Sequence, residues 1–296
     1  MGVRRAVDMT ISAAESSAAK SGRRVYTLGP LIHNPKVLKD LEKRGIRIME
    51  EDSLNGSIEE APENSMVIIR AHGVSPETEK KIADYGYEIC DATCPHVKAS
   101  QKKAQVFAEK GYGIFLAGEE NHAEIIGIRG YAADHGNNAS VYVVGNPAEA
   151  GVSAGELFRR EPEANTALIA QTTISPEEYC AIGKEIKRFF PELTIENTIC
   201  SAITARQEAL RELCLTADAL IIAGGKESAN TRRLLSLALD MGKPAWIAED
   251  PGDIPGEIAR FKTVGLSAGA STPDDLIDEI EEALKKMADK STEELD

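Results

Sequence analysis

The sequence predicts an α/β fold of three pseudo-symmetric units, each built on a parallel sheet. Short apolar runs rich in Val and Ile alternate with segments of helical period, such as Pro176–Phe190, and this alternation is typical of βαβ units. An apolar run, a small polar set and a helix start also recur about every hundred residues. The spacings from Ser75 to Ser175 and from Ser175 to Thr272 are 100 and 97 residues. The sequence therefore predicts an internal threefold repeat.

Two phrases of the repeat divide the 296-residue chain. The first phrase places strands at about Met66, Ala167 and Thr263, and the second at about Val25, Ile114 and Leu220. We expect the units to cover residues 1–95, 96–195 and 196–272, near the common domain size. The last helix, residues 273–287, is expected to pack on the first unit.

Each first phrase ends in a helix start of the Ser-Pro-Glu or Thr-Pro-Asp type. A hydroxyl at the N-cap, proline at the first helical position and acids in the first turn all favour a helix there. For Ser75, Ser175 and Thr272 we therefore favour simple capping. The polar residues nearer the strand ends differ, because ligands of parallel sheets collect beyond the carboxyl ends of the strands.

Charge and composition exclude several classes of function. The chain has 34 basic and 48 acidic residues, a net charge of −14, which is the wrong sign for a nonspecific binder of nucleic acid or anionic membranes. Neither a signal peptide nor an apolar membrane span is present in the sequence, so we expect a cytoplasmic protein. Five cysteines without a small-domain disulfide pattern are expected to be reduced thiols or metal ligands.

Two of these cysteines occupy the same place in the repeat. Cys94 and Cys200 each follow a strand-like run and open a long helix, and the segment from Met1 fits the phrase if a cysteine stands just before it. Three thiolates on a pseudo-threefold axis suit three irons of a cubane cluster and leave the fourth open. A buried structural role is the alternative. Cys90, Cys180 and Cys214 have no repeat partner and are expected in the core.

Polar residues at the other strand ends have the chemistry of an anion site. Imidazoles, hydroxyls and an amide recur there without a repeated Lys or Arg, and such groups bind phosphate or diphosphate through N–H and O–H donors. The set consists of His33, His72, His122, Thr172, Ser228, Asn230 and Ser271. Glu124 follows His122 by two residues, and in a pocket with a bound anion we expect it to have a raised pKa and to donate a proton. An ordinary first-turn acid of a helix is the alternative.

The motifs together closely resemble the 4-hydroxy-3-methylbut-2-enyl diphosphate reductase family, also called IspH or LytB, from Met1 to about Leu284. They are His33-Asn34, Ala71-His72-Gly73-Val74-Ser75, Asp91-Ala-Thr-Cys94-Pro95, His122-Ala-Glu124, Gln171-Thr172-Thr173, Cys200 with Arg206-Gln207, Ser228 with Asn230, and Ala268-Gly-Ala-Ser271. The resemblance implies three units around a central cluster and substrate site, and the last, reductive step of non-mevalonate isoprenoid synthesis.

The resemblance also implies roles for individual residues. Cys94 and Cys200 would ligate a 4Fe-4S cluster, and Glu124 with Thr172 would protonate the departing hydroxyl. The diphosphate would be held by His33, Asn34, His72, His122, Thr172, Ser228, Asn230 and Ser271. Electrons would come from a ferredoxin or flavodoxin-type donor, since the sequence shows no dinucleotide glycine fingerprint.

Three departures from the family pattern keep other hypotheses open. The family has a strand ending in cysteine directly before the residue matching Met1, while Ala229 and Ile203 replace a frequent Ser and Thr. We expect a longer form of the chain to carry that cysteine, and the 296-residue form to bind its cluster poorly. The alternatives are a non-catalytic diphosphate-binding paralogue that has lost its cluster and a metal-free α/β binding protein.

Overall fold

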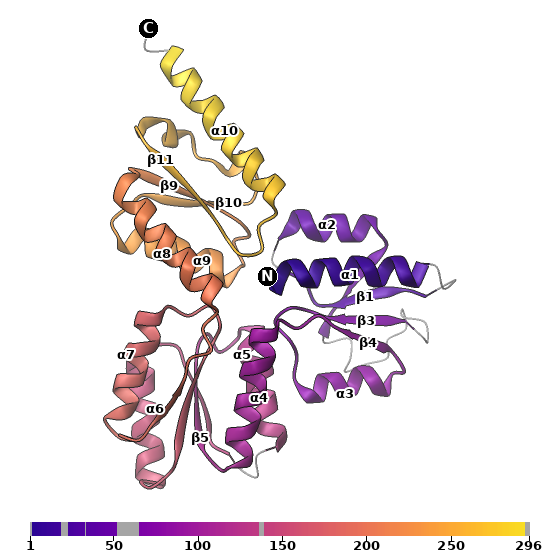
Figure 1. Cartoon of the computed structure of the whole chain (residues 1–296), viewed down its shortest axis with the longest axis vertical. Coiled ribbons are helices and arrows are strands. Elements are labelled where there is room, and N and C mark those ends of the chain that lie inside the picture. Colours follow the sequence, from indigo (N-terminus) through magenta and orange to yellow (C-terminus); the bar gives the residue numbers. More distant parts are fainter. Residues whose placement is uncertain (1, 19–22, 33, 52–64, 136–138, 294–296) are drawn as a thin grey trace. The chain divides into compact units, whose positions relative to one another are not determined.

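The computed structural model in Figure 1 describes residues 2–18, 23–32, 34–51, 65–135 and 139–293. Within these residues the strands form three separate sheets, and every strand pair is parallel. Helices flank each sheet, because a crossover between parallel strands runs over a sheet face. The α/β class and the three parallel sheets predicted from the repeat are confirmed.

The first sheet has the strand order β2-β1-β3-β4. Its elements are α1 (Gly2–Ala18), β1 (Val25–Leu28), α2 (Pro35–Lys43), β2 (Ile46–Met49), β3 (Met66–Ile69), α3 (Pro76–Asp84) and β4 (Glu88–Asp91). Both central strands, β1 and β3, are buried along their whole length. Ile82 of α3 packs on one face of the sheet with Leu28, Val67 and Ile69.

The second sheet repeats this topology with the order β6-β5-β7-β8. Its elements are α4 (Pro95–Glu109), β5 (Gly113–Ala117), α5 (Ala123–His135), β6 (Val141–Val144), α6 (Pro147–Arg160), β7 (Thr166–Ala170), α7 (Pro176–Lys187) and β8 (Thr194–Glu196). Ile114 and Leu116 of β5 pack against α4 and α5, while Phe115 and Ala117 pack against α6 and α7. Both faces are covered, which explains why β5 is continuously apolar.

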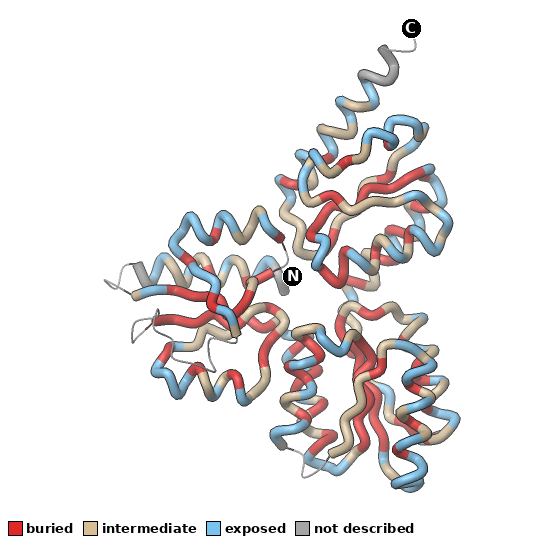
Figure 2. Tube along the Cα trace, turned by 180° about the vertical axis from the view of Figure 1, so that it is seen from behind, coloured by how far each residue is buried: buried red, intermediate tan, exposed pale blue. Residues whose placement is uncertain are grey.

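The third sheet has the order β10-β9-β11. Its elements are α8 (Ser201–Thr216), β9 (Ala219–Ala223), α9 (Ala229–Asp240), β10 (Ala245–Ala248), the 3₁₀ segments η2 (Pro251–Asp253) and η3 (Gly256–Arg260), β11 (Val264–Ala268) and α10 (Asp274–Glu293). The strands β1, β5 and β9 are those predicted by the second phrase, and β3, β7 and β11 those predicted by the first. Figure 2 shows buried residues concentrated along the strands and on one side of the helices.

Contacts divide the chain into two compact units rather than three. One consists of residues 1–31 and 41–200 and contains the first two sheets; the other consists of residues 32–40 and 201–296 and contains the third. The two sheets of the larger unit are joined through α5, which contacts both α4 and α3. The boundaries at 95/96 and 195/196 remain predictions.

The C-terminal helix α10 packs its apolar side on the third sheet, while its polar side meets Lys36 of residues 1–95, the first unit on which it was expected to pack. Leu276 and Ile280, one turn apart, are buried against Ile221 of β9 and Ile258 of η3. Lys36 forms ion pairs with Asp275 and Glu279 on the polar side of the helix. Neither α10 nor another described helix combines the length and the apolar composition needed to cross a membrane.

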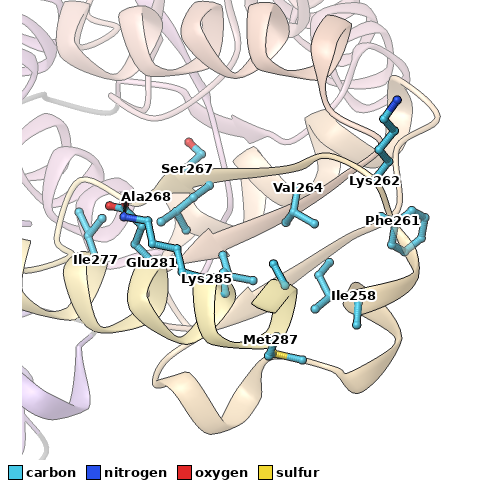
Figure 3. Close-up of a pocket in the computed structure, with 14 residues that line it drawn as sticks. Ile258, Phe261, Lys262, Val264, Ser267, Ala268, Ile277, Glu281, Lys285 and Met287 are labelled. Carbon is cyan, nitrogen blue, oxygen red and sulfur yellow. Dashed lines mark ion pairs between the residues drawn. The ribbon is translucent and has the colours of Figure 1, made fainter. Parts of the chain in front are cut away.

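An apolar groove of about 580 Å³ lies between β11, the segment after η3 and α10 (Figure 3). Its walls include Val264 and Leu266 of β11 and Ile277, Leu284 and Met287 of α10. In the described part of the chain, β11 is an edge strand that pairs with β9 alone. Its counterparts in the repeat, β3 and β7, each pair with a strand on both sides. Its residues are accordingly less buried than those of β3 and β7.

We predict that Leu157→Ala destabilises the second sheet by about 2–5 kcal/mol, because it removes a fully buried side chain of α6 that packs directly over Gly113 of β5. Val152→Ala on the same helix is the matched control, since Val152 is 71% exposed and its loss should change stability by less than about 0.5 kcal/mol. Urea unfolding of both variants measures the difference. Equal midpoints would contradict this packing.

Candidate active site

The two repeat cysteines occupy equivalent positions in the first and second sheets. Cys94 lies beside the end of β3, and Cys200 lies beside the end of β7. The Cys94 amide donates to the carbonyl of Ala71, two residues beyond β3, at 2.9 Å. The Cys200 amide donates to the carbonyl of Thr172, two residues beyond β7, at 3.0 Å. Both thiols are half-buried, and each stands directly before a helix. The parallel pairing of the backbones thus continues past the ends of the strands. It places each cysteine beside the polar loop that follows β3 or β7.

Asp91 stabilises the loop that precedes Cys94. The Asp91 carboxylate accepts from the Thr93 amide at 2.8 Å and pairs with Lys98. Burial works to raise the pKa of Asp91, but the bonds from Lys98 and Thr93 outweigh it and hold the pKa below the usual value. The ionised carboxylate therefore stabilises the turn that presents Cys94.

Glu124, at the start of α5, is the one acid of the predicted set, and it is buried. It is 1% exposed, and both its carboxylate oxygens meet Thr172: the Thr172 amide donates to Oε1 at 2.7 Å, and the Thr172 hydroxyl donates to Oε2 at 2.8 Å. An ordinary first-turn acid faces solvent, so burial with two directed donors favours the functional interpretation over capping. Glu124 and Thr172 are thus brought together across two elements of the second sheet.

Two predicted histidines also meet. The rings of His72 and His122 lie 5.3 Å apart in an edge-to-face arrangement. The Glu124 amide donates to Nδ1 of His122 at 3.2 Å, so Nδ1 carries no proton and the neutral ring is protonated on Nε2. His122 can therefore present an N–H donor while its other nitrogen caps α5.

Glycines allow the His72 loop to approach α5 closely. A Cβ atom at Gly130 would lie 2.4 Å from Cβ of Ser75, and one at Gly127 would lie 3.4 Å from the carbonyl oxygen of Val74. Because α5 also carries Glu124, this approach joins the acid, His122 and the His72 loop within the larger unit.

Three other predicted residues lie in the smaller compact unit, which contains the third sheet. They follow the ends of β9 and β11. The Ser228 hydroxyl accepts from the Thr231 amide as the N-cap of α9. Asn230 is 5% exposed, and neither the nitrogen nor the oxygen of its side-chain amide has a hydrogen-bond partner among the described residues. Ser271 is half-buried in the loop after β11. An enclosed amide without partners is typical of a side chain that binds a ligand.

The remaining predicted residues have mixed outcomes. Asn34 is buried, and its side-chain oxygen accepts from the Val37 amide at 3.1 Å, which caps α2. His33 lies outside the described residues. Capping by Ser75 and Ser175 is confirmed. Thr272 behaves differently, since its hydroxyl donates to the carbonyl of Ala223 and ties the loop to β9.

The other cysteines do not all lie in the core. Cys214 is buried against the third sheet, as expected, and Cys90 is half-buried on β4. The expectation for Cys180 is wrong, because this residue lies on the exposed face of α7, while Tyr179 and Ile182 occupy the buried face.

Thiolates suit iron, and Cys94 and Cys200 match the expected donor chemistry of an iron–sulfur cluster at two positions. Among the described residues, no group of three His, Cys, Asp or Glu side chains forms a ready metal site. The chain thus offers two candidate cluster ligands.

Sequence reasoning assigned no role to Gln101 or to the glycines of α5. Gln101 is 4% exposed although it carries an amide, and Gly127 and Gly130 occur inside a helix where glycine is unfavourable. A helix with two glycines three residues apart, directly after Glu124, was the available signal of a close approach.

Comparison with known proteins gives a consistent result. The family model described as LytB protein matches residues 1–285. A 4-hydroxy-3-methylbut-2-enyl diphosphate reductase from Treponema denticola is 43% identical over 96% of this chain and 94% of its own length. Its Aquifex aeolicus counterpart is 36% identical over 97% and 93%, respectively.

Solved structures of similar proteins share the fold. The E-1-hydroxy-2-methyl-but-2-enyl-4-diphosphate reductase from Plasmodium falciparum has a TM-score of 0.82 and 26% identity, covering 94% of this chain and 83% of that one. A structure of (E)-4-hydroxy-3-methyl-but-2-enyl diphosphate reductase, described as the terminal enzyme of the non-mevalonate pathway, has a TM-score of 0.66 and 36% identity, covering 97% and 95%. With a family model across residues 1–285 and close relatives along nearly its full length, the chain belongs to the LytB family.

Proposed function

We propose that this chain is an oxidoreductase that converts 4-hydroxy-3-methylbut-2-enyl diphosphate to isopentenyl and dimethylallyl diphosphates. The single observation that carries the proposal is the buried Glu124–Thr172 pair, because removal of a hydroxyl group needs a proton donor shielded from water. The names of the relatives supply the substrate.

The bonds of Glu124 indicate which oxygen handles the proton. Oε1 faces the Thr172 amide, which can only donate, so a proton on Oε1 would be opposed. Oε2 faces the Thr172 hydroxyl, which can donate or accept. A proton carried on Oε2 can therefore pass to the Thr172 oxygen and from there to a departing substrate hydroxyl.

We propose diphosphate-binding roles for His33, Asn34, His72, His122, Thr172, Ser228, Asn230 and Ser271. The Nε2–H donor of His122 and the unpartnered amide of Asn230 support these roles most directly. Neutral donors suit a strongly acidic chain, because they direct hydrogen bonds to the anion without needing the lysines and arginines that would pair with the many carboxylates.

For the reductive part we propose that Cys94 and Cys200 hold a 4Fe-4S cluster. Such a cluster, when bound, supplies electrons to the substrate. Half-burial of both thiols, at equivalent strand ends, supports these ligands. We further propose a ferredoxin or flavodoxin-type electron donor and a cytoplasmic location, both of which rest on the sequence.

We predict that Glu124→Gln lowers the rate of the reductive step by at least about 100-fold while diphosphate binding stays near normal. The amide can accept from the Thr172 amide and donate to the Thr172 hydroxyl, so the local fold is kept, but it cannot deliver a proton. Single-turnover kinetics at saturating substrate measure the rate. An unchanged rate would remove Glu124 from the mechanism.

We predict that His72→Phe and Ser271→Ala each weaken binding by about 1.5–3 kcal/mol, the loss of one hydrogen bond to a charged group. Calorimetry with inorganic diphosphate measures the change. Ser140→Ala is a suitable control, because Ser140 lies beside β6 and bonds Arg160 at the surface. Wild-type affinity in both site variants would place the anion elsewhere.

We predict that Cys94→Ser and Cys200→Ser each reduce the iron and sulfide retained per chain after anaerobic reconstitution, because a hydroxyl is a poor substitute for a thiolate. Cys180→Ser is the matched control, since Cys180 is exposed on α7. Iron and acid-labile sulfide assays are run beside the parent chain. Equal retention in all three variants would exclude both proposed ligands.

A further inference from the structure

Gln101 is a buried polar residue of α4, the helix that begins after Cys94. Its side-chain amide donates to the carbonyl oxygen of Val74 at 3.3 Å, and the residue is 4% exposed. Val74 is 3% exposed, so water has little access to this carbonyl. The bond therefore satisfies an enclosed backbone acceptor.

The same amide fills the space beside the turn at Gly73. Gly73 has a φ of 71°, and a Cβ atom there would lie 2.6 Å from Nε2 of Gln101. Only glycine adopts this conformation without strain, and only glycine leaves room for the amide. The His72–Gly73–Val74 backbone and the Gln101 side chain therefore fit as one unit.

Gln101 also contacts the helix that carries the proposed acid. A Cβ atom at Gly127 of α5 would lie 3.3 Å from Nε2 of Gln101, and Gly127 stands one turn after Glu124. The amide thus lies where α4, the His72 loop and α5 converge. His122 directly precedes α5, and its ring meets that of His72 at 5.3 Å.

We infer that Gln101 is a positioning residue: it fixes the Val74 peptide against α5 and so sets the His72 ring beside His122 for anion binding. The Gly73 amide donates to the Arg70 carbonyl at 2.9 Å, which closes the turn before Val74, while Gln101 holds the turn from the Val74 side. Loss of the Gln101 donor therefore releases the Val74 side of the turn and shifts the His72 ring, while Glu124 stays bonded to Thr172. The role in anion binding rests on the proposed function, whereas the positioning of His72 does not.

The test replaces Gln101 by Met, which keeps an unbranched side chain of similar length and removes the N–H donor. Gln105→Met is the matched control, because Gln105 lies on the same helix. Its side chain forms hydrogen bonds with Lys102 and Glu109 at the protein surface. NMR of the full chain labelled in its histidine rings, with His72→Phe for assignment, reports the ring environments. Calorimetry with inorganic diphosphate reports binding, and thermal unfolding reports stability.

We expect Gln101→Met to shift the signals of His72 and His122 and to weaken diphosphate binding about tenfold, while Gln105→Met changes neither. If Gln101→Met does not fold, Gln101→Asn, which keeps the amide but withdraws it by one carbon, carries the same expectation. Wild-type histidine signals in a folded Gln101 variant would overturn the inference. If the parent chain does not bind diphosphate, the proposed function fails, and the histidine signals still decide the role of Gln101.

Discussion

The candidate site depends on two equivalent backbone hydrogen bonds, from Cys94 to Ala71 and from Cys200 to Thr172. Each bond continues a parallel strand pairing two residues beyond the strand end, where regular pairing has stopped. A half-buried thiol is thereby fixed beside a polar loop in both sheets of the larger unit.

Enclosed polar groups are the second constraint. Glu124, Thr172 and Gln101 are all buried, and each bond that they form spares a group that would otherwise be costly to enclose. Gly127 supplies the room for this arrangement, at the expense of helix propensity in α5. The glycine lowers the stability of α5 itself but allows the helix to lie close to the His72 loop.

The two contact units carry different kinds of candidate group. The larger unit holds the thiols, the carboxyl group and the paired imidazoles, while the second holds Ser228, Asn230 and Ser271 at the ends of β9 and β11. In the larger unit, Glu124 and Thr172 satisfy one another through two hydrogen bonds. In the smaller unit, the side-chain amide of Asn230 has no hydrogen-bond partner among the described residues. This is consistent with the proposed role of Asn230 in binding a ligand.

The sequence by itself determined the repeat, the parallel strands and the helix starts at Ser75 and Ser175, because periodicity and capping are local properties of the chain. It also singled out Glu124 and Thr172, and the family resemblance paired their roles, but it gave no contact between them. Their contact joins residues 48 positions apart and arises only from the packing of α5 beside the end of β7. The exposure of Cys180 and the packing of α10 on the third sheet were likewise decided by tertiary structure, since the buried side of a helix is set by the surface that it meets.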